Sequence, residues 1–332
     1  MAGPLSLVTG GTGFVGAAVI RELLAHGHRI RALVRPGSDR RNLAGLAVET
    51  AEGRLEDPAS LARATAGADA LFHVAADYRL WAPDPAPMMA ANVAGTVALM
   101  TAALDAGIPR IVHTSSVAAL GHHADGSPAD EATPVELADM IGPYKRSKFL
   151  SERAVLGLVR DRGLPAVVVN PAAPVGPRDI KPTPTGRMVL DAARGRLPAF
   201  VRSGLNIVHV ADVATGHRLA YERGAVGERY VLGAENRSLG DVIATAARLA
   251  GRRPPAIRLP IAPLWPVAVV AEGAGRLFGF APPISRDLLC MARRPMHFSH
   301  ARAIRELGYR PRPADEGLAD AIAWFRAQGY MR

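Results

Sequence analysis

The sequence predicts an α/β fold in which a doubly wound parallel sheet is followed by a smaller, mostly helical lobe. Up to residue 170, short apolar segments suited to buried strands alternate with segments of helical pattern. Right-handed crossovers between parallel strands bring their carboxyl ends to one edge of the sheet, where ligands bind. Beyond residue 170 the pattern changes to a proline-rich loop and a series of helices. We therefore expect a sheet domain at 1–170 and a substrate lobe at 171–332, with some chain crossing back to the sheet domain.

The strands expected in the first domain are short and apolar, at residues 5–9, 28–34, 47–51, 68–74, 110–114 and 166–170. The helices between them are expected at about 14–26, 85–106 and 142–162. After an irregular loop at 171–186, two further strands are expected at 205–210 and 228–232. The remaining segments have helical patterns, at about 186–195, 211–223, 238–250, 264–279, 285–293, 299–307 and 315–328.

A glycine-rich turn joins the first strand to the first helix. Gly10, Gly13 and Gly16 follow the pattern G-x-x-G-x-x-G. The first glycine permits a tight turn, the second lets the backbone approach a pyrophosphate, and the third lets the helix pack closely on the strand. The helix then directs unpaired N–H groups and its positive dipole end at the phosphates. This context predicts a Rossmann-type dinucleotide site, with further contacts from Thr12, Phe14 and Val15.

The composition restricts the classes of function. The apolar fraction is 49% and the formal charge is +10, but nearly all the basic residues are scattered arginines. This pattern favours a small-molecule substrate over a nucleic-acid partner, and we expect no metal site. Cys290 is the only cysteine, which excludes an intrachain disulfide and favours a reducing compartment. The longest apolar run, 261–271, is interrupted by prolines and too short to span a membrane. A cytoplasmic protein, at most peripheral to a membrane, is expected.

Tyr144 and Lys148 form a Y-x-x-x-K pair at the start of the helix after the fifth strand. Residues four apart share a helix face, so the Lys148 ammonium should lower the pKa of Tyr144 and make it a general acid or base near neutral pH. Lys148 can also hold the nicotinamide ribose hydroxyls. A serine pair follows the strand, and Ser116, favoured over Ser115, would bind a substrate oxygen and stabilise alkoxide charge. Together these groups fit hydride transfer to or from a carbonyl.

The choice of cofactor depends on the residue at the end of the second strand. An acidic residue there would bind a ribose 2′-hydroxyl, whereas an arginine suits a 2′-phosphate. The strand ends at Arg35, and Arg40 and Arg41 follow closely, with no acid at its tip. NADP(H) is therefore favoured over NAD(H), with Arg35 and Arg41 as the expected phosphate contacts.

Several segments together resemble the extended short-chain dehydrogenase/reductases. They are Val8–Gly16, Phe72–Ala76, Asn92–Thr96, Thr114–Gly121, Tyr144–Lys148, His209–Val213 and the carboxyl-terminal stretch Ala301–Pro313. The resemblance implies that Ser116, Tyr144 and Lys148 form a catalytic triad and that Asn92 supports the site. We also expect cofactor contacts from Leu55, Val74, Ala75, Ala76, Asn92, Thr114, Pro171 and Val175. The family often forms homodimers through the helices near 95–106 and 142–162.

Within that family, three segments are similar to the hopanoid-associated sugar epimerases of the dihydroflavonol-reductase-like branch: Asp77–Pro85, Asp139–Gly142 and Gly176–Asp179. Two positions depart from the family pattern. Gly53-Arg54-Leu55 stands where relatives have Gly-Asp-Leu, and arginine cannot accept the adenine amino hydrogen bond, so this bond must go to the backbone or to Asp57, or is not made at all. Ala172-Ala173 replaces hydroxyl residues and makes the substrate edge less polar.

The reaction itself has more than one interpretation. The Arg-Tyr-Phe-Asn segment of nucleotide-sugar epimerases is replaced by Val169–Pro174, which resembles reductases and sterol-type dehydrogenases. Apolar residues flank the expected substrate entrance, at Tyr78, Leu80, Trp81, Met88 and Met89, and the two methionines fit a helix core equally well. We predict an NADP(H)-dependent oxidoreductase for a carbonyl or hydroxyl of a hydrophobic, hopanoid-linked, sugar-like substrate, bound by Tyr78, Trp81, Ser116 and Arg187. A sugar epimerase or dehydratase using transient oxidation on the same triad is the alternative, and an inactive NADP sensor is a third.

Overall fold

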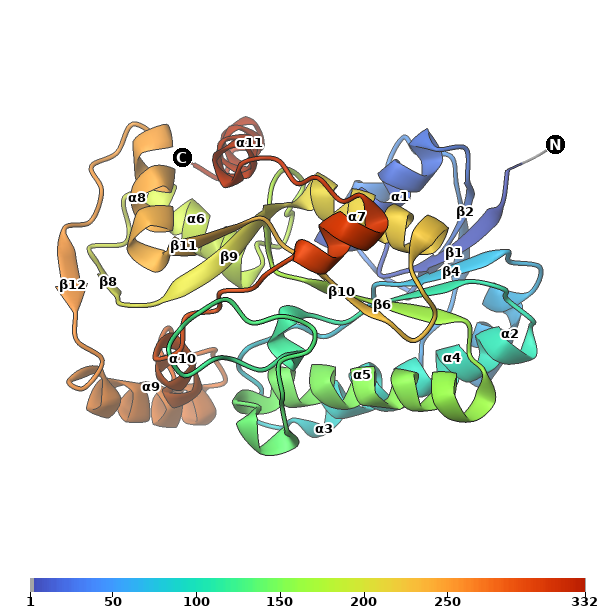
Figure 1. Ribbon diagram of the computed structural model, residues 1–332. Coiled ribbons are helices and arrows are strands. Elements are labelled where there is room, and N and C mark those ends of the chain that lie inside the picture. Colours follow the sequence, from blue (N-terminus) through green and yellow to red (C-terminus); the bar gives the residue numbers. More distant parts are fainter. Residues whose placement is uncertain (1–2, 332) are drawn as a thin grey trace.

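The computed structural model describes residues 3–331. At its centre is a parallel sheet of seven strands in the order β10-β6-β5-β4-β1-β2-β3, which confirms the predicted fold class (Figure 1). The strands are β1 (Leu5–Thr9), β2 (Arg29–Val34), β3 (Val48–Glu52), β4 (Ala70–His73), β5 (Ile111–Thr114), β6 (Ala166–Pro171) and β10 (Arg229–Leu232). The strand order reverses between β1 and β4, and ligands of doubly wound folds bind at such a switch point. The glycine-rich turn follows β1 and therefore opens at this point.

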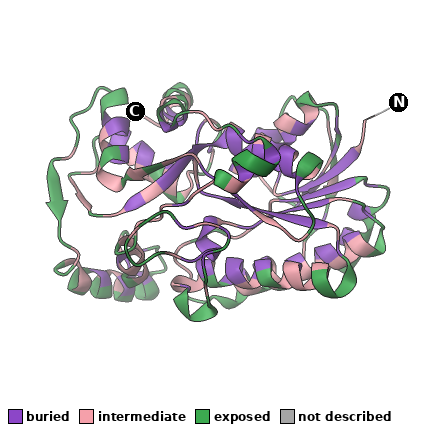
Figure 2. Ribbon diagram, in the orientation of Figure 1, coloured by how far each residue is buried: buried purple, intermediate pink, exposed green. Residues whose placement is uncertain are grey.

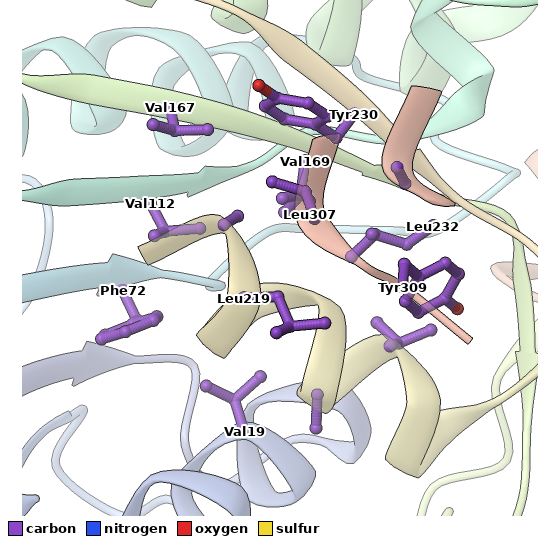
Figure 3. Packing of buried hydrophobic residues seen from close by; sticks show 14 of the residues in the cluster. Val19, Phe72, Val112, Val167, Val169, Leu219, Tyr230, Leu232, Leu307 and Tyr309 are labelled. Atoms are coloured by element: carbon purple, nitrogen blue, oxygen red, sulfur yellow. The ribbon is translucent and has the colours of Figure 1, made fainter. Parts of the chain in front are cut away.

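Helices cover both faces of the sheet because successive strand side chains point to opposite sides. Val8 and Val112 face the cluster shown in Figure 3, which includes residues of α1 and α7. Leu7 and Ile111, one position earlier in each strand, face a second cluster with residues of α2, α4 and α5. The helices are α1 (Phe14–Ala25), α7 (Val210–Arg223), α2 (Pro58–Thr65), α4 (Gly95–Asp105) and α5 (Gly142–Arg162). The strands between them are largely buried, except the edge strand β3, none of whose residues is buried (Figure 2).

The seventh strand comes from the second half of the chain. β10 pairs in parallel with β6, with Arg229 opposite Val168 and Leu232 opposite Pro171. The preceding helix, α7, packs against α1 on the outer face of the sheet. The segment that crosses back therefore completes the central sheet.

The rest of the second half has its own core, with Val189, Ile207, Val242, Leu318 and Phe325 among its buried residues. Its helices are α6 (Pro184–Ala193), α8 (Leu239–Leu249), α9 (Leu264–Phe278), α10 (Arg286–Ala292) and α11 (Ala314–Ala327). Its strands are β7 (Ala173–Val175), β9 (Gly204–His209) and β11 (Glu235–Ser238) in one sheet, and β8 (Ala199–Val201) and β12 (Ile257–Leu259) in another. Of these strands only β9 was expected, and the segment expected as a helix at 299–307 has a π-helical turn at Ala303–Leu307.

The segment Ala86–Asp105 is apolar and long enough, by length and composition alone, to cross a membrane. It consists of α3 (Ala86–Met89), a π-helical turn (Ala90–Ala94) and α4. It packs against α5, and α4 also contacts α2. Leu99 and Met100 are fully buried in the cluster beneath the sheet. These contacts make the segment a core helix of the sheet domain.

Candidate active site

The glycine turn leaves an open cradle at the amino end of α1. Gly10 has φ +70°, and a Cβ there would lie 2.7 Å from the Ala75 nitrogen. A Cβ on Gly16 would lie 2.2 Å from the Gly10 carbonyl oxygen, whereas one on Gly13 would meet only that oxygen, at 3.2 Å. In the described part of the chain, no side chain caps α1 and no acid lies in its first turn. The N–H groups and positive helix end fit a pyrophosphate, so the residues present fit a dinucleotide cofactor.

A buried chain of polar side chains connects this turn to α5. The two ring nitrogens of His73 lie 2.7 Å from the Thr9 hydroxyl and 2.9 Å from the Thr96 hydroxyl. The Thr96 hydroxyl donates to the Asn92 carbonyl oxygen at 2.7 Å. Thr9, His73 and Thr96 have no predicted role from the sequence. The signal that the sequence offers is a histidine, His73, at the end of a buried apolar strand.

Asn92 lies on the π-helical turn and joins three segments. Its Nδ2 donates to the Asp77 carbonyl oxygen at 2.8 Å and to the Ser147 hydroxyl at 2.9 Å. Its Oδ1 accepts from the Asp77 nitrogen at 2.7 Å, and the Ser147 hydroxyl donates to the Tyr144 carbonyl oxygen at 2.8 Å. Asn92 therefore holds the loop after β4 against the first turn of α5. π-helical turns of this kind occur frequently at functional sites.

The structure brings Ser116, Tyr144 and Lys148 together at the carboxyl end of β5. The Ser116 hydroxyl caps a short 3₁₀ helix, accepting from the Ala118 nitrogen at 3.1 Å, and lies near enough to the Tyr144 hydroxyl to lower the pKa of Tyr144. The Lys148 ammonium donates to the Thr114 carbonyl oxygen at 2.7 Å. Ser115 is buried, and within residues 3–331 its hydroxyl has no hydrogen-bond partner. It is therefore Ser116 that shares a site with Tyr144.

The ionisation of the Tyr144 and Lys148 pair differs from the expected one. Burial raises the pKa of Tyr144 above its ordinary value, and the hydrogen bond with Ser116 opposes that rise. Burial lowers the pKa of Lys148 to about 8, and the Glu152 carboxylate opposes that shift. The expectation that Lys148 lowers the Tyr144 pKa is wrong for this structure, because desolvation of the ring dominates. Tyr144 is thus a protonated hydrogen-bond donor at neutral pH.

These two shifts predict the pH dependence of carbonyl reduction. The Lys148 ammonium is lost as the pH rises through its pKa of about 8, whereas burial holds the pKa of Tyr144 above its ordinary value. We expect kcat/KM, which reports free-enzyme groups, to fall above pH 8. A profile that stays flat up to pH 10 would contradict this assignment.

The matched control for this profile is the neighbouring lysine. Burial, with a contribution from Arg294, also lowers the pKa of Lys145 to about 8. Lys145→Met should keep the alkaline fall, and Lys148→Arg should remove it because arginine stays charged.

The arginines near the end of β2 differ in their partners. Arg41 pairs with Asp39 at 2.7 Å, and Arg40 pairs with Glu52. Arg35 is exposed, and among the described residues it forms no ion pair within 4.0 Å. Arg35 is therefore the arginine at this strand end whose guanidinium is free for an anion.

Arg54, which stands where relatives have aspartate, is held through its backbone. Its backbone is fixed by Ser60, whose hydroxyl accepts from the Arg54 nitrogen and donates to its carbonyl oxygen, both at 3.1 Å. The Arg54 side chain is exposed. Asp57 accepts from the Ala59 nitrogen at 3.1 Å and caps α2. One Asp57 oxygen is thus used as a helix cap.

The other expected cofactor residues lie at two places. Leu55, Val74, Ala75, Ala76, Thr114 and Pro171 follow or end strands of the central sheet on its carboxyl edge, beside the glycine turn. The side chain of Val175 is buried in the core of the second lobe, where a Cβ on Gly317 would lie 2.9 Å from it. The Val175 side chain is therefore part of that core.

Trp81 lines a cavity of about 440 Å³ beside the amino end of α5. The other lining residues are Leu80, Ala82, Pro83, Pro143, Trp265, Glu272, Arg276, Arg286 and Asp287. Pro143, one of these lining residues, immediately precedes Tyr144 at the start of α5. The Arg276 guanidinium lies over the Trp81 ring at 5.9 Å, and the buried Glu272 pairs with Arg286 at 2.9 Å. Local sequence pattern predicts only the apolar part of this wall, because its charged residues come from helices distant in sequence.

Tyr78 and Arg187 meet around a different residue, Asp179. The negative charge of Asp179 helps to raise the pKa of Tyr78, after burial, and Arg187 lowers that of Asp179. Burial nevertheless raises the pKa of Asp179 to about 6. Its Oδ2 accepts from the Thr183 nitrogen and hydroxyl at 2.8 Å. Met88 is fully buried, so its position fits the helix-core interpretation.

A family model, two relatives and a solved structure all match most of this chain. Residues 6–233 match the family described as the NAD dependent epimerase/dehydratase family. The chain is 41% identical over 329 residues to a protein of Synechocystis sp. that carries the name dihydroflavonol 4-reductase, with 98% of this chain and 95% of the relative covered. It is 37% identical over 328 residues to sterol demethylase protein B of Methylococcus capsulatus, covering 98% of this chain and 99% of the relative. The crystal structure of gox2253 is 57% identical and superposes with a TM-score of 0.90, covering 99% of this chain and 100% of that one.

Proposed function

The chain belongs to the NAD-dependent epimerase/dehydratase family within the extended short-chain dehydrogenase/reductases, and from this premise we propose that it is an NADP(H)-dependent oxidoreductase acting on the carbonyl or hydroxyl of a hydrophobic substrate. The predicted resemblance to the dihydroflavonol-reductase-like branch is confirmed by these relatives. The observation that carries the proposed reaction is that Ser116 and Tyr144 come together at the carboxyl edge of the sheet, where the glycine cradle also opens, and that Pro143, next to Tyr144, lines the cavity of Trp81.

Tyr144 is the proposed general acid. Ser116 holds the carbonyl oxygen, and Tyr144 donates its phenolic proton to that oxygen as the carbonyl carbon is reduced, so that an alcohol forms. A bound reduced nicotinamide would supply the hydride. Lys148, near its pKa at neutral pH, holds the ribose hydroxyls and stabilises the phenolate that remains. Asn92 keeps the first turn of α5 in place through Ser147.

The proposed preference for NADP(H) depends on Arg35, with Arg41 as a second contact that must first leave Asp39. A hydrogen bond to a charged group contributes about 1.5–3 kcal/mol. Arg35→Ala should therefore weaken NADPH binding about 10- to 100-fold and leave NADH binding nearly unchanged. Fluorescence titration of both cofactors measures this. Equal affinity of the parent protein for NADH and NADPH would refute the preference.

The proposed substrate is a hydrophobic, hopanoid-linked, sugar-like molecule. Two tryptophans suit apolar ring faces, and the Glu272–Arg286 pair can meet hydroxyl groups. The sterol in the name of the Methylococcus relative favours a polycyclic lipid, as do the segments similar to hopanoid-associated epimerases. Arg187 and Tyr78 would contact the polar end of the substrate near Asp179.

A sugar epimerase or dehydratase is the second candidate, favoured by the description of the matching family. Incubation with ribosyl-hopane-type and nucleotide-sugar substrates, followed by chromatography of the products, separates the two. A reduced or oxidised product supports the oxidoreductase, and an inverted or dehydrated sugar supports the second candidate. The presence of both Tyr144 and Lys148 makes an inactive NADP sensor the weakest alternative. We place the reaction in the cytoplasm, and α4 and α5 are the proposed homodimer surface.

A further inference from the structure

The outward face of α9 and the turn after it is apolar. Val267, Val269 and Val270 are 53%, 52% and 72% exposed, and Leu277, Phe278 and Phe280 are 77%, 73% and 44% exposed. The helix lies at the lower left margin of the molecule in Figure 1, and Figure 2 shows its outer surface as mostly exposed. Isolated apolar residues are common on protein surfaces. Six large ones on one helix and its turn form an exposed apolar patch, and such patches typically mark an interaction site.

The opposite face of α9 belongs to the cavity described above. Ala268, Glu272 and Gly275 are buried, and Trp265, Glu272 and Arg276 line the cavity. One helix of 15 residues thus separates the cavity from the exposed apolar face. A hydrophobic molecule that reached the outer face would need to pass only this helix to enter the cavity.

The charges around the apolar face are predominantly positive. Between residues 258 and 294 there are five arginines and two acids. One of the acids, Glu272, is buried and neutralised by Arg286. Arg276 and Arg293 lie over the rings of Trp81 and Trp265, at 5.9 and 5.5 Å, so these cations lie close to the amphipathic helix.

We propose that α9 docks on an anionic lipid bilayer, with its apolar face in the interface and the arginines on and around the helix at the headgroups, and that the substrate enters the cavity from that side. Interfacial helices combine an apolar face rich in large side chains with basic residues that attract anionic lipids. A second copy of this chain is a poorer occupant, because it would bring an equally basic surface against this one. The entry route rests on the proposed function, whereas the docking does not.

The test is co-sedimentation of the whole protein with vesicles, without substrate or cofactor. The protein should bind phosphatidylglycerol vesicles and be released by salt, with much weaker binding to phosphatidylcholine vesicles. Val270→Asp with Leu277→Asp should weaken binding at least ~10-fold, because both side chains enter the interface. Val226→Asp is the matched control, since Val226 is 49% exposed in the turn before β10, and it should bind like the parent. NADPH affinity should be the same in all the variants, which shows that they are folded.

Absence of binding to anionic vesicles, or equal binding by the α9 variant, would overturn the proposal. If the parent protein forms a dimer and the α9 variant is a monomer, the apolar face of α9 is a contact between two copies of the chain. That result would also overturn the membrane-docking proposal. Failure of the proposed reductase activity leaves these readouts unaffected, so the two failures are distinguishable.

Discussion

Replacing Tyr144 with phenylalanine is expected to lower kcat for carbonyl reduction about 10²- to 10⁴-fold, the contribution typical of a general acid. The hydroxyl is the only group removed, and Asn92 and Ser147 still hold the first turn of α5 through the Tyr144 carbonyl oxygen. NADPH affinity should therefore be unchanged. Steady-state kinetics and a cofactor titration measure the two effects separately.

The neighbouring tyrosine provides the control. Tyr78 is 43% exposed, and the charge of Asp179 helps to raise its pKa. Tyr78→Phe should retain a kcat near that of the parent and change mainly KM. Unchanged activity of Tyr144→Phe would refute the role assigned to this hydroxyl.

Replacing Gly16 with alanine is expected to weaken NADPH binding about 10²-fold, equivalent to losing one or two charge-assisted hydrogen bonds from the turn. The new Cβ would lie 2.2 Å from the Gly10 carbonyl oxygen and 3.0 Å from the Gly11 nitrogen, so the backbone of the turn must move. Isothermal titration with NADPH measures the loss.

Two companion variants separate binding from folding. In Gly13→Ala the new Cβ has one close contact, with the Gly10 carbonyl oxygen at 3.2 Å, so this variant should fold normally. Its methyl group would occupy the cradle and should therefore weaken NADPH binding. Gly157→Ala, in the middle of α5, has only the Asp161 carboxylate nearby, at 4.0 Å, and should leave binding intact while slightly raising the melting temperature. NADPH binding by Gly13→Ala as tight as that of the parent would show that the cradle does not hold the pyrophosphate.

Much of the sheet domain could be predicted from local sequence pattern. β1, α1 and α5 have the expected bounds within a residue or two, because a buried apolar run, a glycine turn and a long helical period are strong local signals. α2 was missed although Asp57 and Pro58 form an ordinary helix start, since the helix has only eight residues. The position of β10 at the edge of the sheet depends on pairing between distant segments, which local pattern does not encode.

The strands missed in the second lobe are only three or four residues long. β11 is Glu-Asn-Arg-Ser, a composition that does not favour a strand, and it forms by antiparallel pairing with β9, from Glu235 opposite Ile207 to Ser238 opposite Gly204. Tertiary pairing outweighs intrinsic propensity there. β12 is Ile-Arg-Leu, with all three residues exposed, and it forms by pairing with the three residues of β8.

The site could be predicted in its residues but not in its electrostatics. Spacing alone indicated Tyr144 and Lys148, yet the direction of the Tyr144 pKa shift depends on how deeply the fold buries the ring. The same holds for Asp179, whose raised pKa requires the burial of a loop that the sequence shows only as proline-rich. The charged wall of the cavity, with Glu272 and Arg286, likewise depends on how α9 and α10 pack.

The central claim is net hydride transfer between NADPH and a hydrophobic carbonyl substrate. It is tested most directly by single turnover with NADPH deuterated at the transferable position of the nicotinamide ring. The oxidoreductase predicts one deuterium on the product carbinol carbon for each NADPH consumed, and no product label with Tyr144→Phe. Inverted substrate with no deuterium and with the NADPH absorbance unchanged would contradict it and assign the chain to the epimerases.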